Sequence, residues 1–283
     1  MDAETSIGRR FQDRGALLCL DTSHERFDFA TRNANVVLGR PADTTWKGQL
    51  VAEVFQRDLL HAIRNCIGSQ SLHKRRRYLG MFSSQGQSYD VELFAVKERF
   101  VLEIVPAGTE HVPGVYEALQ DYEVLSEAVI SKSQSDGMFD RLTSLLRVMS
   151  GYHCVAIDCV DVQGVRLVSA SGNEDFATCP TDFPRQLSAV RDVAAATTCF
   201  DVTDASGDFD CGLSGLSLPE PEVLNALRDQ NIRACAALGL WRSSERWGRI
   251  KFLHGQPRLP NRRTKLAMEF LGPLLGQRLL SLN

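Results

Sequence analysis

The sequence predicts an α+β protein of two domains, each with a central antiparallel sheet flanked by helices. Short apolar runs joined by tight turns recur along the chain, which is typical of antiparallel hairpins. Stretches with apolar residues at helical spacing lie between these runs, and a Pro-Gly pair at 113–114 separates two blocks of them. A length of 283 residues is enough for two ordinary domains.

The first block spans residues 11–110 and follows a polar stretch, residues 1–10, that we expect to be flexible. Its pattern predicts two strands, then two short helical segments, and then a meander of three strands. The expected strands are 16–20, 26–32, 75–82, 89–95 and 100–105, and the expected helical segments are 33–38 and 56–66.

The second block spans residues 111–283 and is organised around the stretch 231–254. There, two apolar runs flank a polar turn, which predicts a hairpin buried in the core of a sheet. Residues 203–221 are rich in Gly, Ser, Asp and Pro and form a loop long enough to suggest a function. The other expected elements are helices 115–131, 138–149, 183–195, 222–229 and 261–282, and strands 154–160, 165–169 and 198–202.

The composition is that of an ordinary soluble protein, with 43% apolar and 24% charged residues. A net charge of −3 gives no reason to expect binding to nucleic acid or to a membrane. The N-terminus has no apolar core of the kind found in secretory signals, so we expect a cytoplasmic location. The eight cysteines lie mostly in apolar runs and are interpreted as small core residues. No phosphate-binding loop, nucleophile motif or zinc-protease motif is present, so we expect no enzymatic activity.

Four stretches resemble, in the right order, the PAS and GAF domains at the front of bacterial phytochromes. FQDRGALL (11–18) is similar to the family's I-Q-P-H-G-A-L-L, and YDVELFAVKERFVLEIVPA (89–107) to the closing strands of its PAS domain. GYHCVAIDCVD (151–161) is similar to G-Y-D-R-V-M-V-Y-R-F-D, and TDFP (181–184) to S-D-I-P. The hairpin 231–254 is similar to the central hairpin of the GAF domain. The resemblance implies a PAS-like domain at 11–110 and a GAF-like domain at 111–283.

The resemblance also implies a pocket for a bilin chromophore in the GAF-like domain. The residues that it places at this pocket are Asp182, Pro184, His254 and Asp158, the last at the position of a pocket tyrosine. Two of them have a simpler structural interpretation. Asp182 precedes a helical pattern and fits a helix N-cap, and His254 fits a solvated residue at the end of a strand. No metal site is expected at His153, Cys154 and Cys159, because the two cysteines are an odd number of residues apart on a strand and so face opposite sides.

Several residues that a bilin needs are replaced. No cysteine precedes the first motif, and the cysteine and histidine of plant-like members fall on Glu222 and Val223. The arginine that pairs with a propionate falls in the run 194–197, and Leu253 replaces one of two histidines. We therefore expect no cofactor, the alternative being biliverdin bound non-covalently.

These replacements predict a non-enzymatic signalling protein that has lost covalent bilin attachment and acts through contacts with a signalling or regulatory protein. We expect no output domain after the GAF-like stretch, and this expectation favours the same interpretation. The alternative is a photoreceptor or small-molecule sensor that binds biliverdin or a heme-type tetrapyrrole non-covalently in the GAF pocket.

Two further features bear on partners. The basic run 74–77 is interpreted as a solvated sheet edge protected by charge. The C-terminal helical stretch 261–282 has an apolar face that suits a helix bundle, either with the stretch 115–129 or across a homodimer.

Overall fold

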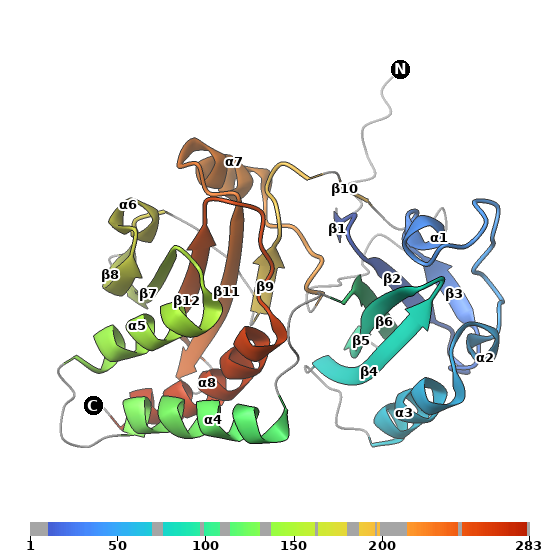
Figure 1. The fold of residues 1–283 in the computed structure, drawn as a ribbon, viewed down its shortest axis with the longest axis horizontal. Helices are drawn as coiled ribbons and strands as arrows, with labels where there is room; N and C mark the ends of the chain where they lie inside the picture. The colour runs from blue at the N-terminus through green and yellow to red at the C-terminus, as the bar shows by residue number, and fades with distance from the viewer. Residues whose placement is uncertain are drawn as a thin grey trace. The chain divides into compact units, whose positions relative to one another are not determined.

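The computed structural model describes residues 11–69, 76–96, 99–107, 114–130, 137–161, 164–179, 187–195, 197–198, 214–242 and 245–281. They form two compact units, and each contains a five-stranded antiparallel sheet flanked by helices (Figure 1). The first unit comprises Met1–Gly108 and Ala195–Leu218, and the second comprises Thr109–Ala194 and Pro219–Asn283. The predicted α+β class with two sheets is confirmed.

The sheet of the first unit has the strand order β3-β2-β6-β5-β4. Three helices cover one of its faces and bury a continuous apolar core there. The strands are β2 (Ala16–Leu20), β3 (Phe27–Ala30), β4 (Arg76–Ser84), β5 (Gln87–Val96) and β6 (Arg99–Pro106), and the helices are α1 (Ala34–Val37), α2 (Val51–Val54) and α3 (Arg57–Gly68). All the strands and helical segments expected for this block are present, and α2 is an addition.

The opposite face of this sheet is covered by residues from far along the chain. Strand β1 (Phe11–Gln12) pairs with β10 (Thr197–Thr198), and Phe11 also forms a bridge with Ser217. Leu216 is fully buried in an apolar cluster with Phe11 on this face. Gly15 permits the close approach, because a Cβ there would lie 2.7 Å from the Ile104 carbonyl oxygen and 3.0 Å from a Leu216 methyl group.

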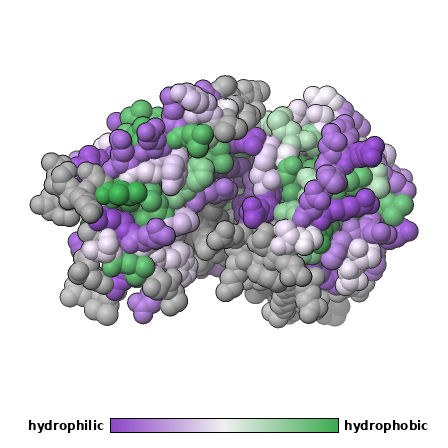
Figure 2. Space-filling view, turned by 90° about the horizontal axis from the view of Figure 1, so that it is seen from below, coloured by the Kyte–Doolittle hydropathy of each residue, from purple (hydrophilic) through white to green (hydrophobic). Residues whose placement is uncertain are grey.

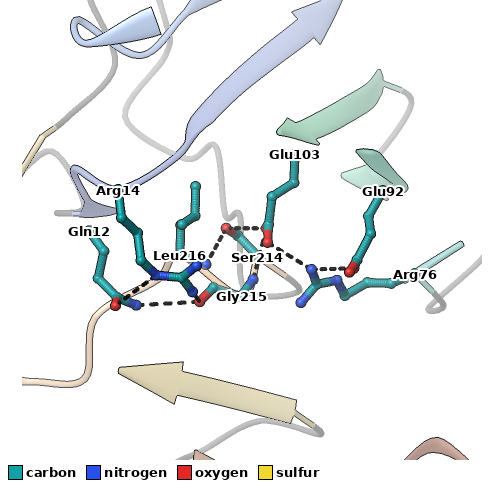
Figure 3. Close-up of polar contacts among 8 residues, drawn as sticks. All are labelled: Gln12, Arg14, Arg76, Glu92, Glu103, Ser214, Gly215 and Leu216. Atoms are coloured by element: carbon teal, nitrogen blue, oxygen red, sulfur yellow. Dashed lines mark hydrogen bonds and ion pairs between the residues drawn. The ribbon is translucent and has the colours of Figure 1, made fainter. Parts of the chain in front are cut away.

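A polar network fixes the segment 214–216 to the same sheet (Figure 3). The buried carboxylate of Glu103 accepts hydrogen bonds from Ser214 Oγ and the Gly215 N–H, both at 2.8 Å. On its other side Glu103 pairs with Arg76 at 2.7 Å, and Arg76 also pairs with Glu92. Arg76 is only 12% exposed, so this part of the basic run is not the solvated sheet edge that the sequence suggested.

The sheet of the second unit has the order β8-β7-β12-β11-β9. The predicted hairpin forms its two strands β12 and β11, with Ala234 opposite His254 at one end of the pairing. The elements are α4 (Val115–Ile130), α5 (Met138–Ser150), β7 (Cys154–Asp161), β8 (Gly164–Gly172), α6 (Glu174–Ala177), β9 (Leu187–Val190), α7 (Pro221–Asp229), β11 (Ala234–Arg242), β12 (Glu245–His254) and α8 (Arg262–Leu280).

Helices α4, α5 and α8 cover one face of the second sheet (Figure 1). Alternate strand residues, such as Ile157, Leu238 and Phe252, point into the core shared with these helices. The apolar face predicted for the C-terminal helix packs here, next to α4, and α8 continues through Pro273.

The prediction of a helix over 183–195 is wrong for its described part. Residues Leu187–Val190 form strand β9, which pairs with β11 from Cys235 to Leu238. Val193 continues the contact by donating its N–H to the carbonyl oxygen of Arg233. Helical spacing of apolar residues was overridden by the free edge of β11, whose backbone groups need partners.

Candidate functional site

The candidate site lies on the face of the second sheet that points away from α4, α5 and α8. Arg249 and Lys251 alternate along β12 with Ile250 and Phe252, whose side chains enter the helix-covered core. Strand alternation therefore turns both cations to the opposite face. Asp158 on β7 lies directly opposite Arg249 in the strand register, so all three charges share that face.

These three side chains form a buried ion cluster, here named the Asp158 cluster. Oxygen Oδ2 of Asp158 lies 3.0 Å from Arg249 Nε and 2.9 Å from Lys251 Nζ. Lys251 Nζ also donates to the carbonyl oxygens of Ala177, at 2.8 Å, and Cys179, at 3.1 Å. Each of the three side chains is 2–3% exposed.

Burial governs the electrostatics of the cluster. It lowers the pKa of Lys251, while the neighbouring carboxylate of Asp158 acts in the opposite direction. Two cations and one anion are expensive to remove from water, and this cost is offset only while their attractions and hydrogen bonds are complete. The cluster is therefore a place where a single substitution has a large effect.

Three thiols surround the cluster. Burial raises the pKa of Cys154 to about 11, and it raises the pKa of Cys179 and of Cys235 as well. In the first unit, burial raises the pKa of Cys19 to about 12, and the side chain is fully buried, as expected for a core residue. A thiol with a raised pKa is protonated at neutral pH and is a poor nucleophile.

The structure places the predicted site residues in different surroundings. Asp158 is the centre of the ion cluster, whereas Asp182 and Pro184 lie outside the described residues. His254 ends β12 with an exposed fraction of 8%, and its ring lies 3.8 Å from that of His153 between centroids. Its alternation with Phe252 places it on the helix-covered side of the strand, and burial lowers its pKa.

Sequence reasoning missed Arg249 and Lys251. Both stand in a run interpreted as apolar, and both replace residues that are apolar in the resembling hairpin. Their spacing could have identified them as site residues. Two charges that lie two positions apart on a buried strand share one face of the sheet, so they need a common counter-ion. Asp158, set alone in the apolar strand CVAIDCV, was the matching charge.

The described residues offer neither a metal-binding cluster nor a membrane-spanning helix. Within them, no three histidine, cysteine, aspartate or glutamate side chains gather closely enough to hold a metal ion. The helices of the described ranges include none with the length and apolarity needed to cross a bilayer.

Comparison with known proteins agrees with this architecture. A family model for the PAS fold matches residues 2–107. No curated protein sequence matches the chain. Among solved structures, the wild-type chromophore-binding domain of Stigmatella aurantiaca phytochrome P1 is similar at a TM-score of 0.79 and 16% identity, over 97% of each chain.

Two further structures give the same result. A mutant chromophore-binding domain of Stigmatella aurantiaca bacteriophytochrome, in the Pr state, is similar at a TM-score of 0.80 and 18% identity, over 100% of this chain and 98% of that one. The chromophore-binding domain of RpBphP3, an unusual bacteriophytochrome from R. palustris, is similar at a TM-score of 0.77 and 14% identity. The match covers 99% of this chain and 98% of that one.

These matches correct one expectation from the sequence. The replaced bilin contacts led us to expect no cofactor, but the structures that match along the whole chain are chromophore-binding domains. The expectation rested on replaced contact positions alone, and it did not consider the charges of Arg249 and Lys251, which lie on the sheet face away from the helices. The chain has the PAS–GAF fold of a phytochrome photosensory module.

Proposed function

We propose that this protein is a sensor that binds a bilin-type tetrapyrrole, such as biliverdin, non-covalently in its GAF-like unit. The observation that carries the proposal is the match to chromophore-binding domains over at least 97% of the chain. A bound bilin would supply absorption of visible light. The protein's own part is to orient the pigment and exclude water around it.

The residues on the candidate face fit the polar end of such a ligand. A tetrapyrrole of this kind carries propionate carboxylates, and these require fixed cations in a buried site. Arg249 brings a guanidinium to this face, where its Nε pairs with Asp158. Lys251 adds a second positive charge on the same face. We infer that Arg249 is the side chain that receives a propionate.

The cysteines favour a non-covalent link. A thioether forms when a thiolate attacks the ligand, and burial keeps Cys154, Cys179 and Cys235 protonated by raising the pKa of each thiol. Small apolar residues on this face, Ala156 and Ala237, flank Lys251 in the strand register and would lie against a flat ring system.

The test is to produce the protein together with a heme oxygenase and record the absorbance of the purified product. We expect a band in the red region that disappears from the protein after acid denaturation and gel electrophoresis, because no covalent bond retains the pigment. The variant Arg249→Gln is expected to lose at least about tenfold in affinity for biliverdin, as one charge-assisted contact is removed.

The matched control is Arg166→Gln, which removes an exposed arginine from the edge strand β8 of the same sheet. It should bind biliverdin like the wild type. The proposal is contradicted if the wild-type protein is purified without colour and added biliverdin does not quench its tryptophan fluorescence. A Soret band with heme and no bilin band contradicts the assignment to a bilin.

We further propose that the protein acts as a homodimer, through the exposed side of α4 and its neighbour α8. Figure 2 views the second unit from the side on which α4 lies, and apolar side chains reach the surface there. On α4, Tyr116 is 74% and Leu119 60% exposed. Tyr122 stacks edge-on with Phe270 of α8, with ring centroids 5.3 Å apart, and extends the same surface.

Replacing Leu119 with Glu is expected to raise the dimer dissociation constant by about 100-fold, because a charge would be buried without a partner. Light scattering over a concentration series measures the change. Val148→Glu on α5 is the control, since Val148 is also exposed, at 77%, but lies outside this surface. A wild-type protein that stays monomeric at every concentration contradicts the dimer.

A further inference from the structure

A hollow in the GAF-like unit lies at one end of its sheet. It has a volume of about 450 Å³ and is formed where β9, α7 and the two ends of the hairpin strands meet. We name it the α7–β11 groove. Its lining residues include Val193, Arg228, Asn231, Arg233, Gly255 and Gln256.

Two arginines of the groove are held in fixed positions. Arg233 forms a two-point pair with Asp192, with Nε–Oδ1 at 2.9 Å and Nη2–Oδ2 at 2.7 Å. Arg228 donates from Nε and Nη2 to the carbonyl oxygen of Val193, at 3.2 and 2.6 Å, and from Nη1 to the Asn225 side chain at 3.0 Å. A pre-oriented guanidinium loses less conformational entropy when it binds a carboxylate.

The groove is positive although the whole chain is negative. Two of its lining residues are charged, Arg228 and Arg233, and both are positive, while Asp192 beside the groove pairs with Arg233. The chain as a whole carries a net charge of −3. A positive groove attracts anionic partners and disfavours cationic ones.

The groove also presents two side-chain amides. Asn231 and Gln256 are exposed, and neither side chain has a hydrogen-bond partner among the residues that the structure describes. Asn231 is held at a φ of 57°, in the left-handed region. An amide offers both a donor and an acceptor, which is what the backbone of an extended peptide can satisfy.

We propose that the α7–β11 groove binds an acidic peptide segment of a partner protein. The two guanidiniums would receive carboxylates of the segment, and the two amides would bind its backbone. This surface is separate from the Asp158 cluster, because its residues lie at the end of the sheet and not on the face of β7 and β12. The proposal therefore does not depend on whether a chromophore is bound.

The test measures binding of a fluorescein-labelled peptide of alternating Glu and Gly to the full-length protein by fluorescence anisotropy. Arg228→Glu is expected to weaken binding by about tenfold or more, and Arg228→Lys by less, since it keeps the charge but loses the forked geometry. The control Arg166→Glu changes the net charge equally on the exposed strand β8 and should leave the affinity within about twofold.

Amide chemical shifts of the wild-type protein provide a second measurement that needs no variant. The Glu-Gly peptide should shift signals from 191–194 and 228–233 and leave those of β8 unchanged. The proposal is overturned if Arg166→Glu weakens binding as much as Arg228→Glu, or if a Lys-Gly peptide binds equally well. It is also overturned if equimolar inorganic phosphate displaces the peptide, or if the groove residues mediate binding to vesicles of anionic lipid instead.

Discussion

Replacing Asp158 with Asn is expected to lower the free energy of unfolding of the second unit by about 3–5 kcal/mol, because the change leaves two buried cations without their shared counter-ion. Arg249 and Lys251 each lie within 3.0 Å of the Asp158 carboxylate, and all three side chains are almost fully buried. The measurement is urea unfolding followed by circular dichroism at neutral pH.

Asp175→Asn is the control, since it removes an aspartate from the exposed side of α6 in the same unit. A loss of stability no larger than that of this control contradicts the role given to Asp158.

The pH dependence of the stability of Asp158→Asn provides a second check. Burial already lowers the pKa of Lys251 below its ordinary 10.5, and loss of Asp158 lowers it further. Stability of Asp158→Asn should therefore recover in part as the pH rises through the lowered pKa of Lys251 towards 10.5, because the folded-state lysine loses its buried charge and the unfolded-state lysine is protonated less and less.

A combined substitution in the Asp158 cluster separates its effect on the stability of the protein from its effect on biliverdin binding. The triple variant Asp158→Leu, Arg249→Met and Lys251→Met replaces the buried charges with apolar side chains of similar size. We expect its stability to return to within about 2 kcal/mol of the wild type, because a buried ion cluster contributes little net stability compared with apolar packing. The triple variant should bind biliverdin at least about tenfold more weakly than the wild type, since Arg249 and Lys251 no longer supply cations on that face of β12.

Replacing Leu216 with Ala is expected to cost the first unit about 3 kcal/mol, the usual effect of removing a fully buried leucine side chain. Leu216 has no exposed surface and packs against Phe11 on the face of the sheet that α1, α2 and α3 do not cover. Thermal unfolding monitored by near-ultraviolet circular dichroism measures the loss.

Leu218→Ala is the matched control, because Leu218 lies two residues along the chain and is only half-buried. It should cost less than half as much. If the two variants are equally stable, then burial of Leu216 contributes no more to the stability of the first unit than the half-buried Leu218 does.

Local patterns in the sequence were enough to predict most of the fold. The hairpin of β11 and β12 was read correctly because two long apolar runs flank a short polar turn, and this is a signal within one short stretch. The helices α4, α5, α7 and α8 were identified from apolar spacing for the same reason. Strand β9 was misread because its identity depends on an edge of β11 more than forty residues away.

The candidate site was harder to predict because it depends on pairs of distant residues. Asp158 was selected from the resemblance alone, as the residue at a pocket position, and its partners 91 and 93 positions later were not. A single sequence does not indicate which charges meet inside a sheet, because strand register sets the pairing. The same limit applies to Arg76, which looked like part of an exposed basic run but pairs with the buried Glu103.

The position of Leu216 has a consequence for how the protein is made. Gln12 and Gly215 are joined by a hydrogen bond across 203 residues, and Leu216 completes the core beside Phe11. A ribosome must therefore synthesise most of the chain before the N-terminal unit can finish folding. Contacts of such long range slow folding and leave partly formed cores exposed in the meantime. Strand β1 is thus the first strand to be synthesised and among the last to pair. The first unit cannot complete its folding until the chain that forms much of the second unit has also been synthesised.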